Sequence, residues 1–465
     1  MDTNKGAGKE EDNYRSRLVA MEINRSPNSE YFSATPPLEV MKLIMSWVAS
    51  RGEFGKGEVG LMYVDVRRAY FNAAVKREVY IQIPKEDFEE GDENKCARLK
   101  ASLYGTRDAA ANWADEYTKT LLEMGFVKGK ASPCIFMHVV KGIKAMVHGD
   151  DFFAGGRVNE LEWMREELKK RYEIKSGLMS GRSQDEKEMN ILNRKIRWTA
   201  GGLEYEADRR HAVEIVRGLG LEEAKEIGTP IEANSAPDED DVVMEGAKAT
   251  AYRSIAARCN YLALDRSDIQ YATKQCCKSM ANPKEGDWQK LKRLGRYLKG
   301  RPVFVSFFRW QGNQERMSVY SDSDWAGDRV DRKSTSGGMI MIGDHLIRSW
   351  SKDQENIALS SGEAELYASC LAGMQSKGLK SYGKDMNIEM EIDLFVDASA
   401  AIGIVQRQGL GKLRHIEVKN LWLQDEVKGE RIRIRKVNGK ENPADLGTKA
   451  LGRDDMDKCV KMASS

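Results

Sequence analysis

Hydrophobic positions alternate with a period of about two residues in some stretches, which is typical of strands, and recur every three to four residues in others, which is typical of helices. In the first half, the strand-like runs are YRSRLVAMEI, GLMYVDV, REVYIQI, CIFMHVV and KAMVHG. The helix-like runs between them are PLEVMKLIMSWVASRG, AAANWADEYTKTLLEMGF and NELEWMREELKKRYEI. Together they predict one αβ region over residues 14–232.

The pattern changes twice in the second half. Residues 250–312 have helical periodicity, most clearly in DWQKLKRLGRYLKG. From residue 315 onward strands and helices mix again, in the order MSVYSDSDW, GGMIMIG, HLIRSWS, SSGEAELYASCLAGMQSKGLKSYG, EIDLFVD, ASAAIGIVQRQ, IEVKNLWLQDEV and RIRIRKV, with a last short helix from Asn442. We therefore expect an α/β (α+β) protein in which a helical unit precedes a mixed-sheet domain over 315–455.

Three polar segments separate or flank these units. Residues 1–13 and 456–465 are predicted to be tails, the first of them disordered. Residues 233–249 contain the acidic run Asp238, Glu239, Asp240 and Asp241. Such a run can bind a metal ion, but a solvated acidic linker is the favoured interpretation.

Composition restricts the class of protein. The chain has 465 residues, enough for two to four domains, and its net charge of only +2 means that a nucleic-acid surface requires local clustering of Lys and Arg. The seven cysteines form no CxxC pair, and five histidines supply no zinc ligand set. No membrane span or signal peptide is predicted. We expect an intracellular protein, cytoplasmic or nuclear and not secreted, without a membrane partner.

The helix predicted around DWQKLKRLGRYLKG is strongly basic. Its apolar positions recur at helical spacing, and much of the remaining surface carries positive charge, from Lys290, Lys292, Arg293, Arg296 and Lys299. Two interpretations remain open: a solvated amphipathic helix, or a helix that lies along a phosphate backbone.

Three carboxylates of the first half stand in unusual places. Asp65 interrupts the apolar strand GLMYVDV, where Asp is disfavoured, and Asp150 and Asp151 are adjacent in VHGDDFF. Like charges that lie so close repel, so the pair is expected either in an ordinary turn or beside a cation. Two divalent cations would need several carboxylates from different strands, which the three aspartates could supply.

These segments, in their order, resemble the reverse transcriptase of copia-type LTR retrotransposons. The resemblance is carried by YRSRLVAMEINRSPNSEYFSATPP, YVDVRRAYFNAAV, LYGTRDAAANWADEYTKTLLEMGF, VHGDDF and YRSIAARCNYLALDRSDIQYA. It implies a right-hand-like palm with truncated fingers in 14–232 and a helical thumb and connection in 250–312. It also implies that Asp65, Asp150 and Asp151 bind metal, that Tyr70 lies under the incoming sugar, and that the triphosphate is contacted by Arg15 and Arg17.

The chain departs from the family pattern near this site. His148 stands where an aromatic residue is usual before the Asp pair, Asp108 replaces the usual Gln, and Ala110 replaces a Pro. Because the Gln normally helps to seat the nucleotide, nucleotide handling is expected to differ here.

A second set of carboxylates follows the order strand, helix, strand, helix: Asp322, Glu363, Asp397 and Asp445. Three of them have an ordinary alternative: Glu363 in a capping box with Ser360, Asp397 as the cap of the next helix, and Asp445 as an exposed residue. The four together, in that order, match ribonuclease H, and SDSDWAGDRVDRKSTSGGMIMIGDHLIRSWSKDQENIALSSGEAEL resembles the copia-type enzyme. Asp324 and His415 are interpreted as structural.

The resemblance implies an RNA-directed DNA polymerase with ribonuclease H activity, using Mg²⁺ (or Mn²⁺) at both sites. The implied partners are an RNA template, a DNA or RNA primer, RNA–DNA hybrid, deoxynucleotide triphosphates and other parts of a retrotransposon polyprotein. Two alternatives remain: a truncated, polymerase-inactive element relic, or a non-enzymatic nucleic-acid-binding module. GDD also suggests a viral RNA polymerase, but the downstream ribonuclease H set argues against it.

Overall fold

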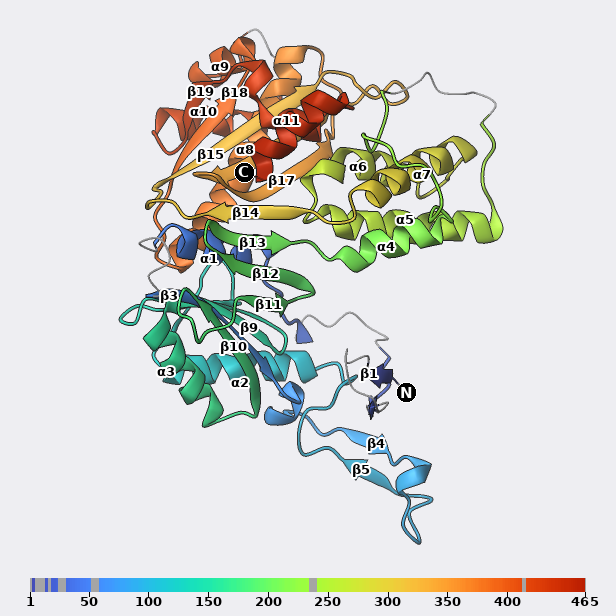
Figure 1. The fold of residues 1–465 in the computed structure, drawn as a ribbon, viewed down its shortest axis with the longest axis vertical. Coiled ribbons are helices and arrows are strands. Elements are labelled where there is room, and N and C mark those ends of the chain that lie inside the picture. Colours follow the sequence, from blue (N-terminus) through green and yellow to red (C-terminus); the bar gives the residue numbers. More distant parts are fainter. Residues whose placement is uncertain are drawn as a thin grey trace.

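The computed structural model describes residues 2–4, 13–15, 18–23, 31–51, 58–233, 241–411 and 415–464. Figure 1 shows three bodies: a sheet region carrying a projecting hairpin, a group of helices to one side, and a second sheet region that contains the C-terminus. The mixture of helices and sheets confirms the predicted fold class. In the part of the chain that is described, no helix combines the length and the apolarity that crossing a membrane requires.

The first region is built on a six-stranded antiparallel sheet with strand order β10-β3-β9-β8-β7-β6. The strands are β3 (Val59–Val66), β6 (Val127–Lys128), β7 (Ile135–His138), β8 (Ile143–His148), β9 (Asp151–Arg157) and β10 (Ile174–Ser180). Alternation along the strands supplies two apolar faces. Leu61 and Phe153 pack with helix α1 (Leu38–Ala49). Met62 and Phe152 share the other core with α2 (Ala109–Glu123) and α3 (Val158–Lys169).

The N-terminal part differs from the prediction. Within the expected tail, β1 (Asp2–Asn4) pairs antiparallel with β2 (Asn13–Arg15), which supplies the backbone partners that an isolated segment lacks. Residues 18–23, predicted as part of a strand, have no regular structure. In place of a ladder, the Ala20 amide donates to the Tyr104 carbonyl (2.8 Å), and the Glu22 carboxylate accepts from the Arg107 amide (3.0 Å) and contacts Arg77. The projecting hairpin consists of β4 (Tyr80–Gln82) and β5 (Cys96–Arg98) (Figure 1).

A four-stranded antiparallel sheet joins the first region to the later ones. Its order is β11-β12-β13-β14, from β11 (Glu188–Ile191), β12 (Arg194–Thr199), β13 (Gly202–Glu206) and β14 (Val305–Arg309). The sequence analysis places residues 305–309 in the helical unit, whereas they form the strand β14. The reason is long-range: β13, about 100 residues earlier in the chain, offers β14 a complete antiparallel ladder, from Gly202 opposite Arg309 to Glu206 opposite Val305.

The helical unit begins earlier than expected. It contains α4 (Arg209–Gly218), α5 (Gly246–Ala263), α6 (Gln270–Lys278) and α7 (Glu285–Gly300). Helix α4 lies inside the range assigned to the first αβ region, but its Ile215 packs in one core with Leu291 and Leu294 of α7. Of the acidic run, Asp238, Glu239 and Asp240 lie outside the described residues. Asp241 accepts a hydrogen bond from the Gly286 amide in the first turn of α7 (3.0 Å).

The C-terminal region contains the expected mixed sheet, with order β17-β16-β15-β18-β19. Strand β15 (Arg316–Asp324) is antiparallel to β16 (Thr335–Ile342), which is antiparallel to β17 (His345–Asp353). On the other side, β15 is parallel to β18 (Glu391–Val396), which is parallel to β19 (Arg433–Lys436). The helices are α8 (Ser361–Asp385), α9 (Ser399–Gln406), α10 (Trp422–Lys428) and α11 (Arg453–Ser464). Short 3-10 turns occur at Ala69–Asn72 (η2), Lys85–Asp87 (η3), Ser267–Ile269 (η4), Val418–Leu421 (η5), Gly439–Glu441 (η6) and Pro443–Gly447 (η7).

The predicted C-terminal tail is instead the body of helix α11. Met456, Cys459 and Ala463 recur at helical spacing and are buried in the core that also holds the helical unit. Burial of this stripe explains why the segment is ordered, and the polar residues between these positions conceal the stripe in the sequence.

The two sheet regions are in contact through α1 and α8. Ser46 on α1 hydrogen-bonds to the Nδ1 of His345 on β17 (2.8 Å). Asp385 near the end of α8 accepts hydrogen bonds from the amides of Lys130, Ala131 and Ser132 (2.9, 2.8 and 3.0 Å). The positions of the two regions are therefore coupled by one buried polar contact at His345 and by more exposed ones at Asp385.

Two candidate carboxylate sites

The first candidate site is a row of polar side chains across the six-stranded sheet. In the strand register Asp65 lies opposite Asp151 on one side and opposite Lys175 on the other, and Asp151 lies opposite His148. Directly opposed residues of antiparallel strands point to the same face. The order across the sheet is therefore Lys175, Asp65, Asp151 and His148, with Asp150 in the turn beside them.

The turn that carries the Asp pair is held by specific contacts. Gly149 has φ of +63°, a conformation that other residues adopt only with strain. The indole N–H of Trp113 donates to the Gly149 carbonyl (2.7 Å), and the Val66 amide donates to the Asp150 carbonyl (3.0 Å). These bonds attach the β8–β9 turn to helix α2 and to the end of β3.

Charge accumulates at this turn. Burial, together with the charges of Asp150 and Asp65, raises the pKa of Asp151 to about 6. The three carboxylates therefore act on one another, and a bound divalent cation would relieve the repulsion. They are less tightly gathered than the second group described below.

Tyr70 lies beside the same turn. It is half-buried in η2, its ring centroid is 4.6 Å from that of Tyr104, and burial together with the charge of Asp150 raises its pKa. Arg17 lies outside the described residues, and Arg15 is described only as a backbone position in β2. The predicted triphosphate contacts therefore remain predictions.

Asp108, which replaces the usual Gln, has a partner of its own. It is buried, and its carboxylate accepts hydrogen bonds from Arg77 (3.0 Å) and Asn112 (3.0 Å). Arg77 also contacts Glu22. Asp108 thus belongs to an ionic network at the start of α2, which accounts for a carboxylate at this position.

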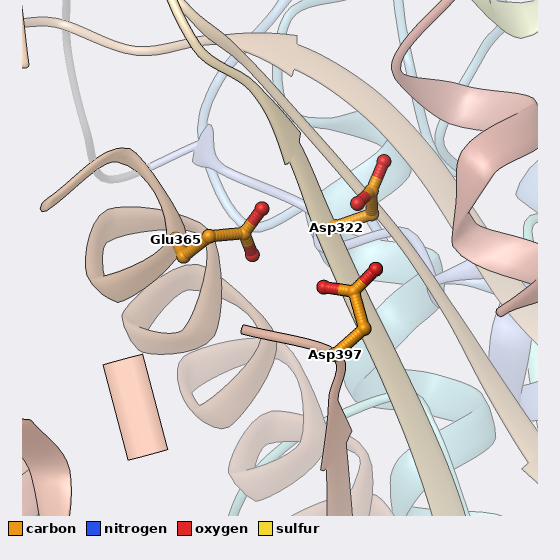
Figure 2. A group of neighbouring side chains, drawn as sticks. All are labelled: Asp322, Glu365 and Asp397. Atoms are coloured by element: carbon orange, nitrogen blue, oxygen red, sulfur yellow. The ribbon is translucent and has the colours of Figure 1, made fainter. Parts of the chain in front are cut away.

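The second candidate site lies at the ends of strands in the C-terminal sheet. Oxygens of Asp322, Glu365 and Asp397 all lie within 4.8 Å of one another, and among the described residues this is the group of three or more that could hold a metal ion. Figure 2 shows the three carboxyl groups directed into one space, from strand β15, helix α8 and the residue after β18. Asp322 and Asp397 follow Ser321 and Val396, which are opposed in the parallel register of β15 and β18.

The glutamate in this group is Glu365, not the predicted Glu363. Residues two positions apart on a helix, such as Glu363 and Glu365, are separated by about 200° around its axis, so only one of the two can face the sheet. Glu363 instead accepts hydrogen bonds from the Leu359 amide (3.0 Å), Tyr367 (2.7 Å) and His415 (3.0 Å). Burial raises its pKa, but these bonds outweigh that effect and lower it. The sequence did contain a signal for this choice. Ser360 caps the helix by accepting from the Glu363 amide, which assigns Glu363 to the cap and leaves Glu365 for the metal site.

Glu365 has the environment of a metal ligand. One carboxylate oxygen accepts a hydrogen bond from the Ser323 amide (3.1 Å), whereas the other is buried without a hydrogen-bond partner. Burial and the charges of Asp322 and Asp397 raise its pKa to about 9. An all-oxygen ligand set suits hard cations such as Mg²⁺ and Mn²⁺, so the residues present fit a divalent ion.

Asp445 adjoins this group from the turn η7. Burial raises its pKa, as does the charge of Asp322. The neighbouring Thr448 donates a hydrogen bond from its hydroxyl to Asp322. Asp445 is thus in electrostatic contact with the three gathered carboxylates, as its place in the sequence suggests.

The basic residues of α7 mostly bind other parts of the chain. Lys290 pairs with Asp287 of the same helix (3.1 Å), whereas Arg293 pairs with Glu232 and donates a hydrogen bond to Thr229. Arg296 and Lys299 donate to backbone carbonyls in the segment 224–225 (2.6 and 2.8 Å). Much of the positive face is therefore used to hold the segment before the acidic linker, which favours the interpretation of α7 as a structural amphipathic helix. Lys292 is half-buried.

The sequence matches known proteins along most of its length. Residues 2–233 match the family described as "Reverse transcriptase (RNA-dependent DNA polymerase)". The chain is 26% identical over 454 residues to the "Retrovirus-related Pol polyprotein from transposon RE1" of Arabidopsis thaliana, covering 95% of this chain and 30% of that protein. It is 24% identical over 465 residues to the corresponding polyprotein from transposon TNT 1-94 of Nicotiana tabacum, covering 97% and 34%. An uncharacterized mitochondrial protein of Arabidopsis thaliana is 32% identical over 194 residues, 40% of this chain and 75% of that protein.

A solved foamy viral protease-reverse transcriptase in complex with dsDNA aligns with 81% of this chain and 68% of that chain, at 12% identity. Its TM-score of 0.21 is too low to support an argument about the fold. The sequence matches define the class of protein as a reverse transcriptase family member. Within that class, the chain belongs to the Pol polyproteins of copia-type retrotransposons and spans about a third of the length of the curated Pol relatives it matches.

Proposed function

We propose that the chain copies RNA into DNA at the first carboxylate site and cleaves the RNA strand of RNA–DNA hybrids at the second. The family match supports the first activity, and the carboxylates of the second site support the other. The observation that carries the second assignment is the convergence of Asp322, Glu365 and Asp397 with a buried, unpartnered oxygen of Glu365.

At the first site, Asp65, Asp150 and Asp151 would hold Mg²⁺ (or Mn²⁺). Bound divalent cations supply charge neutralisation for both the attacking and the leaving oxygen of phosphoryl transfer. The primer 3′-oxygen forms a bond to the α-phosphorus, and the bond to pyrophosphate breaks. Tyr70 lies next to Asp150, where its ring would lie under the incoming sugar and exclude a 2′-hydroxyl.

At the second site, Asp322, Glu365, Asp397 and Asp445 would hold the same kind of cation. Water oxygen forms a bond to the phosphorus of RNA, and the bond to the ribose 3′-oxygen breaks. The partners are then an RNA template, a DNA or RNA primer, RNA–DNA hybrid and deoxynucleotide triphosphates, together with other parts of a Pol polyprotein. The hydrogen bonds to Glu363 and the docked turn η7 would hold the ligands in place.

Primer extension on RNA and cleavage of RNA–DNA hybrid, each with Mg²⁺ or EDTA, test the proposal. A decisive pair of variants is Glu365→Gln and Glu363→Gln, which make the same change two residues apart. Loss of a ligand charge is expected to reduce cleavage ~10³-fold, equivalent to about 4 kcal/mol of transition-state stabilisation, in the first variant only. The second should instead lower thermal stability. Nucleic-acid binding without metal-dependent activity in the wild type would establish the binding-module or relic alternatives.

A further inference from the structure

The segment from Asp445 to Lys449 brings three polar groups to the second site. Besides the carboxylate of Asp445 and the hydroxyl of Thr448, the ammonium of Lys449 lies 2.7 Å from Asp445 Oδ1. The segment is firmly docked, because Asn442 donates to the Ser321 carbonyl on β15 (2.9 Å). A Cβ at Gly447 would also come within 2.6 Å of the Trp350 carbonyl, so the turn lies directly on the sheet.

The charge of Lys449 reaches the whole carboxylate group. Burial lowers the pKa of Lys449, but the hydrogen bond to Asp445 and the charges of Asp322, Asp445 and Asp397 outweigh burial and raise it. In the other direction, burial raises the pKa values of Asp397, Asp445 and Glu365, and the charge of Lys449 partly offsets that rise. One side chain thus has favourable electrostatic interactions with all four carboxylates.

An exposed i,i+4 ion pair would normally contribute little to stability. The pair here differs because Asp445 is only 21% exposed and stands against three further carboxylates. Four ionised carboxylates in one place repel strongly unless they bind protons or a cation is present. A lysine in this position reduces that repulsion when no divalent ion is bound.

A second lysine near the site has another task. Lys436 donates to the backbone carbonyl of Asp397 and to the hydroxyl of Ser399 (3.0 Å), although its charge also partly offsets the rise that burial causes in the pKa of Asp397. It therefore ties β19 to the start of α9. Lys449 pairs directly with a carboxylate oxygen, and its side chain is half exposed, which leaves it room to move away.

We propose that Lys449 is a built-in counter-ion of the second carboxylate site, which holds the four carboxylates together before divalent cations bind and is displaced from Asp445 when they do. Lys449 is thus a positioning residue that competes with the metal. The proposal rests on the proposed function only in taking these carboxylates as a divalent-cation site.

The competition predicts opposite effects on the metal-free and the metal-bound protein. Lys449→Met keeps the aliphatic stem and removes the charge, so the metal-free form should melt about 2–4 °C lower than wild type. Added MgCl₂ should restore the wild-type melting temperature, at a half-maximal concentration ~10-fold lower than in wild type, equivalent to about 1.4 kcal/mol. Lys449→Arg keeps the charge and should behave like wild type.

The measurement is thermal unfolding of the whole chain in EDTA and across a MgCl₂ titration, with Lys461→Met as the control for loss of one positive charge. Lys461 is exposed on α11. The first site is unchanged in every variant, so its response to Mg²⁺ cancels in the comparison. An equal loss of stability with and without Mg²⁺ would show that Lys449 has only a packing role and would overturn the proposal. No change of the wild-type melting temperature with Mg²⁺ would overturn the divalent-cation site itself. The cleavage assay distinguishes that failure, which removes the proposed function as well, from failure of the Lys449 proposal alone.

Discussion

The two carboxylate sites use the same kind of ligand but are assembled in different ways. The first depends on strand register: Asp65 and Asp151 are opposed on the neighbouring strands β3 and β9, and Asp150 lies in the turn that precedes β9. The second combines a strand, a helix, a strand end and a turn, with Asp322 and Thr448 separated by 126 residues in the sequence. A site built within one sheet is determined mainly by local pairing, whereas a site built between layers depends on how a helix is rotated and docked.

The difference also appears in the charges around each site. The pKa of Asp151 is raised by burial and by two further aspartates. In the second site, Lys449 opposes the same kind of effect on Asp397 and Glu365. We infer that the second site is prepared for a cation by its own ammonium. The four predictions below test whether the two sites are independent and what holds each one.

The largest expected effect is the separation of the two activities. Asp65→Asn should reduce primer extension ~10³-fold by removing a ligand charge, while hybrid cleavage remains. Asp322→Asn should have the opposite result. Both activities are to be measured on the same preparations, with circular dichroism to show that each variant is folded. Loss of both activities in either folded variant would refute the two-site interpretation.

The next effect concerns the junction between the regions. His345 is fully buried, its Nε2 donates to the Arg309 carbonyl (2.8 Å), and burial lowers its pKa to about 4. Between pH 6.5 and 4 the unfolded imidazole binds a proton that the folded one does not, so stability is lost as pH falls through this window. The loss attributable to His345 should reach about 2 kcal/mol between pH 7.5 and pH 5.

Urea unfolding at several pH values checks this prediction, with His345→Gln as the comparison. The variant should show a weaker decline of the free energy of unfolding toward pH 5, whatever its stability at pH 7.5. An identical slope in both proteins would mean that His345 does not control the junction.

A smaller effect should distinguish the turn of the first site. Trp113→Phe removes the N–H that donates to the Gly149 carbonyl, and the loosened turn should reduce primer extension ~10-fold, about 1.4 kcal/mol, with unchanged cleavage. Trp350→Phe is a matched control, because the Trp350 indole nitrogen is buried without a hydrogen-bond partner. Equal losses of extension in the two variants would attribute the effect to general packing.

The smallest effect concerns the coupling of the regions. Asp385→Ala leaves the amides of residues 130–132 without their acceptor and should lower the free energy of unfolding by about 1–2 kcal/mol. Primer extension and hybrid cleavage, assayed separately, should both remain. The exposed neighbour Glu389→Ala should have little effect. If the two variants are equally stable in urea, the contact at Asp385 does not join the regions.

Much of the fold could be predicted from the sequence because its information is local. The periodicity of GLMYVDV, KAMVHG and the other runs reports which residues face a core, and the strands β3 and β8 follow it. Strand β14 and helix α11 were missed for the opposite reason. Their partners, β13 and the core of the helical unit, are far away in the sequence, and a short or polar segment does not reveal them.

The sequence by itself determined the fold class and the family, because both depend on the order of periodic segments and motifs along the chain. It also indicated the strand-end carboxylates of both sites: Asp65 in the first, and Asp322 and Asp397 in the second. Only the tertiary structure decided between Glu363 and Glu365, because the rotation of α8 follows from its cap and its packing on β15. Only the tertiary structure could reveal Lys449 as well, because its proximity to Asp322 and Asp397 results from the docking of η7 on the sheet. Local patterns specify which side chains a segment presents, whereas the packing of distant segments specifies which of them meet.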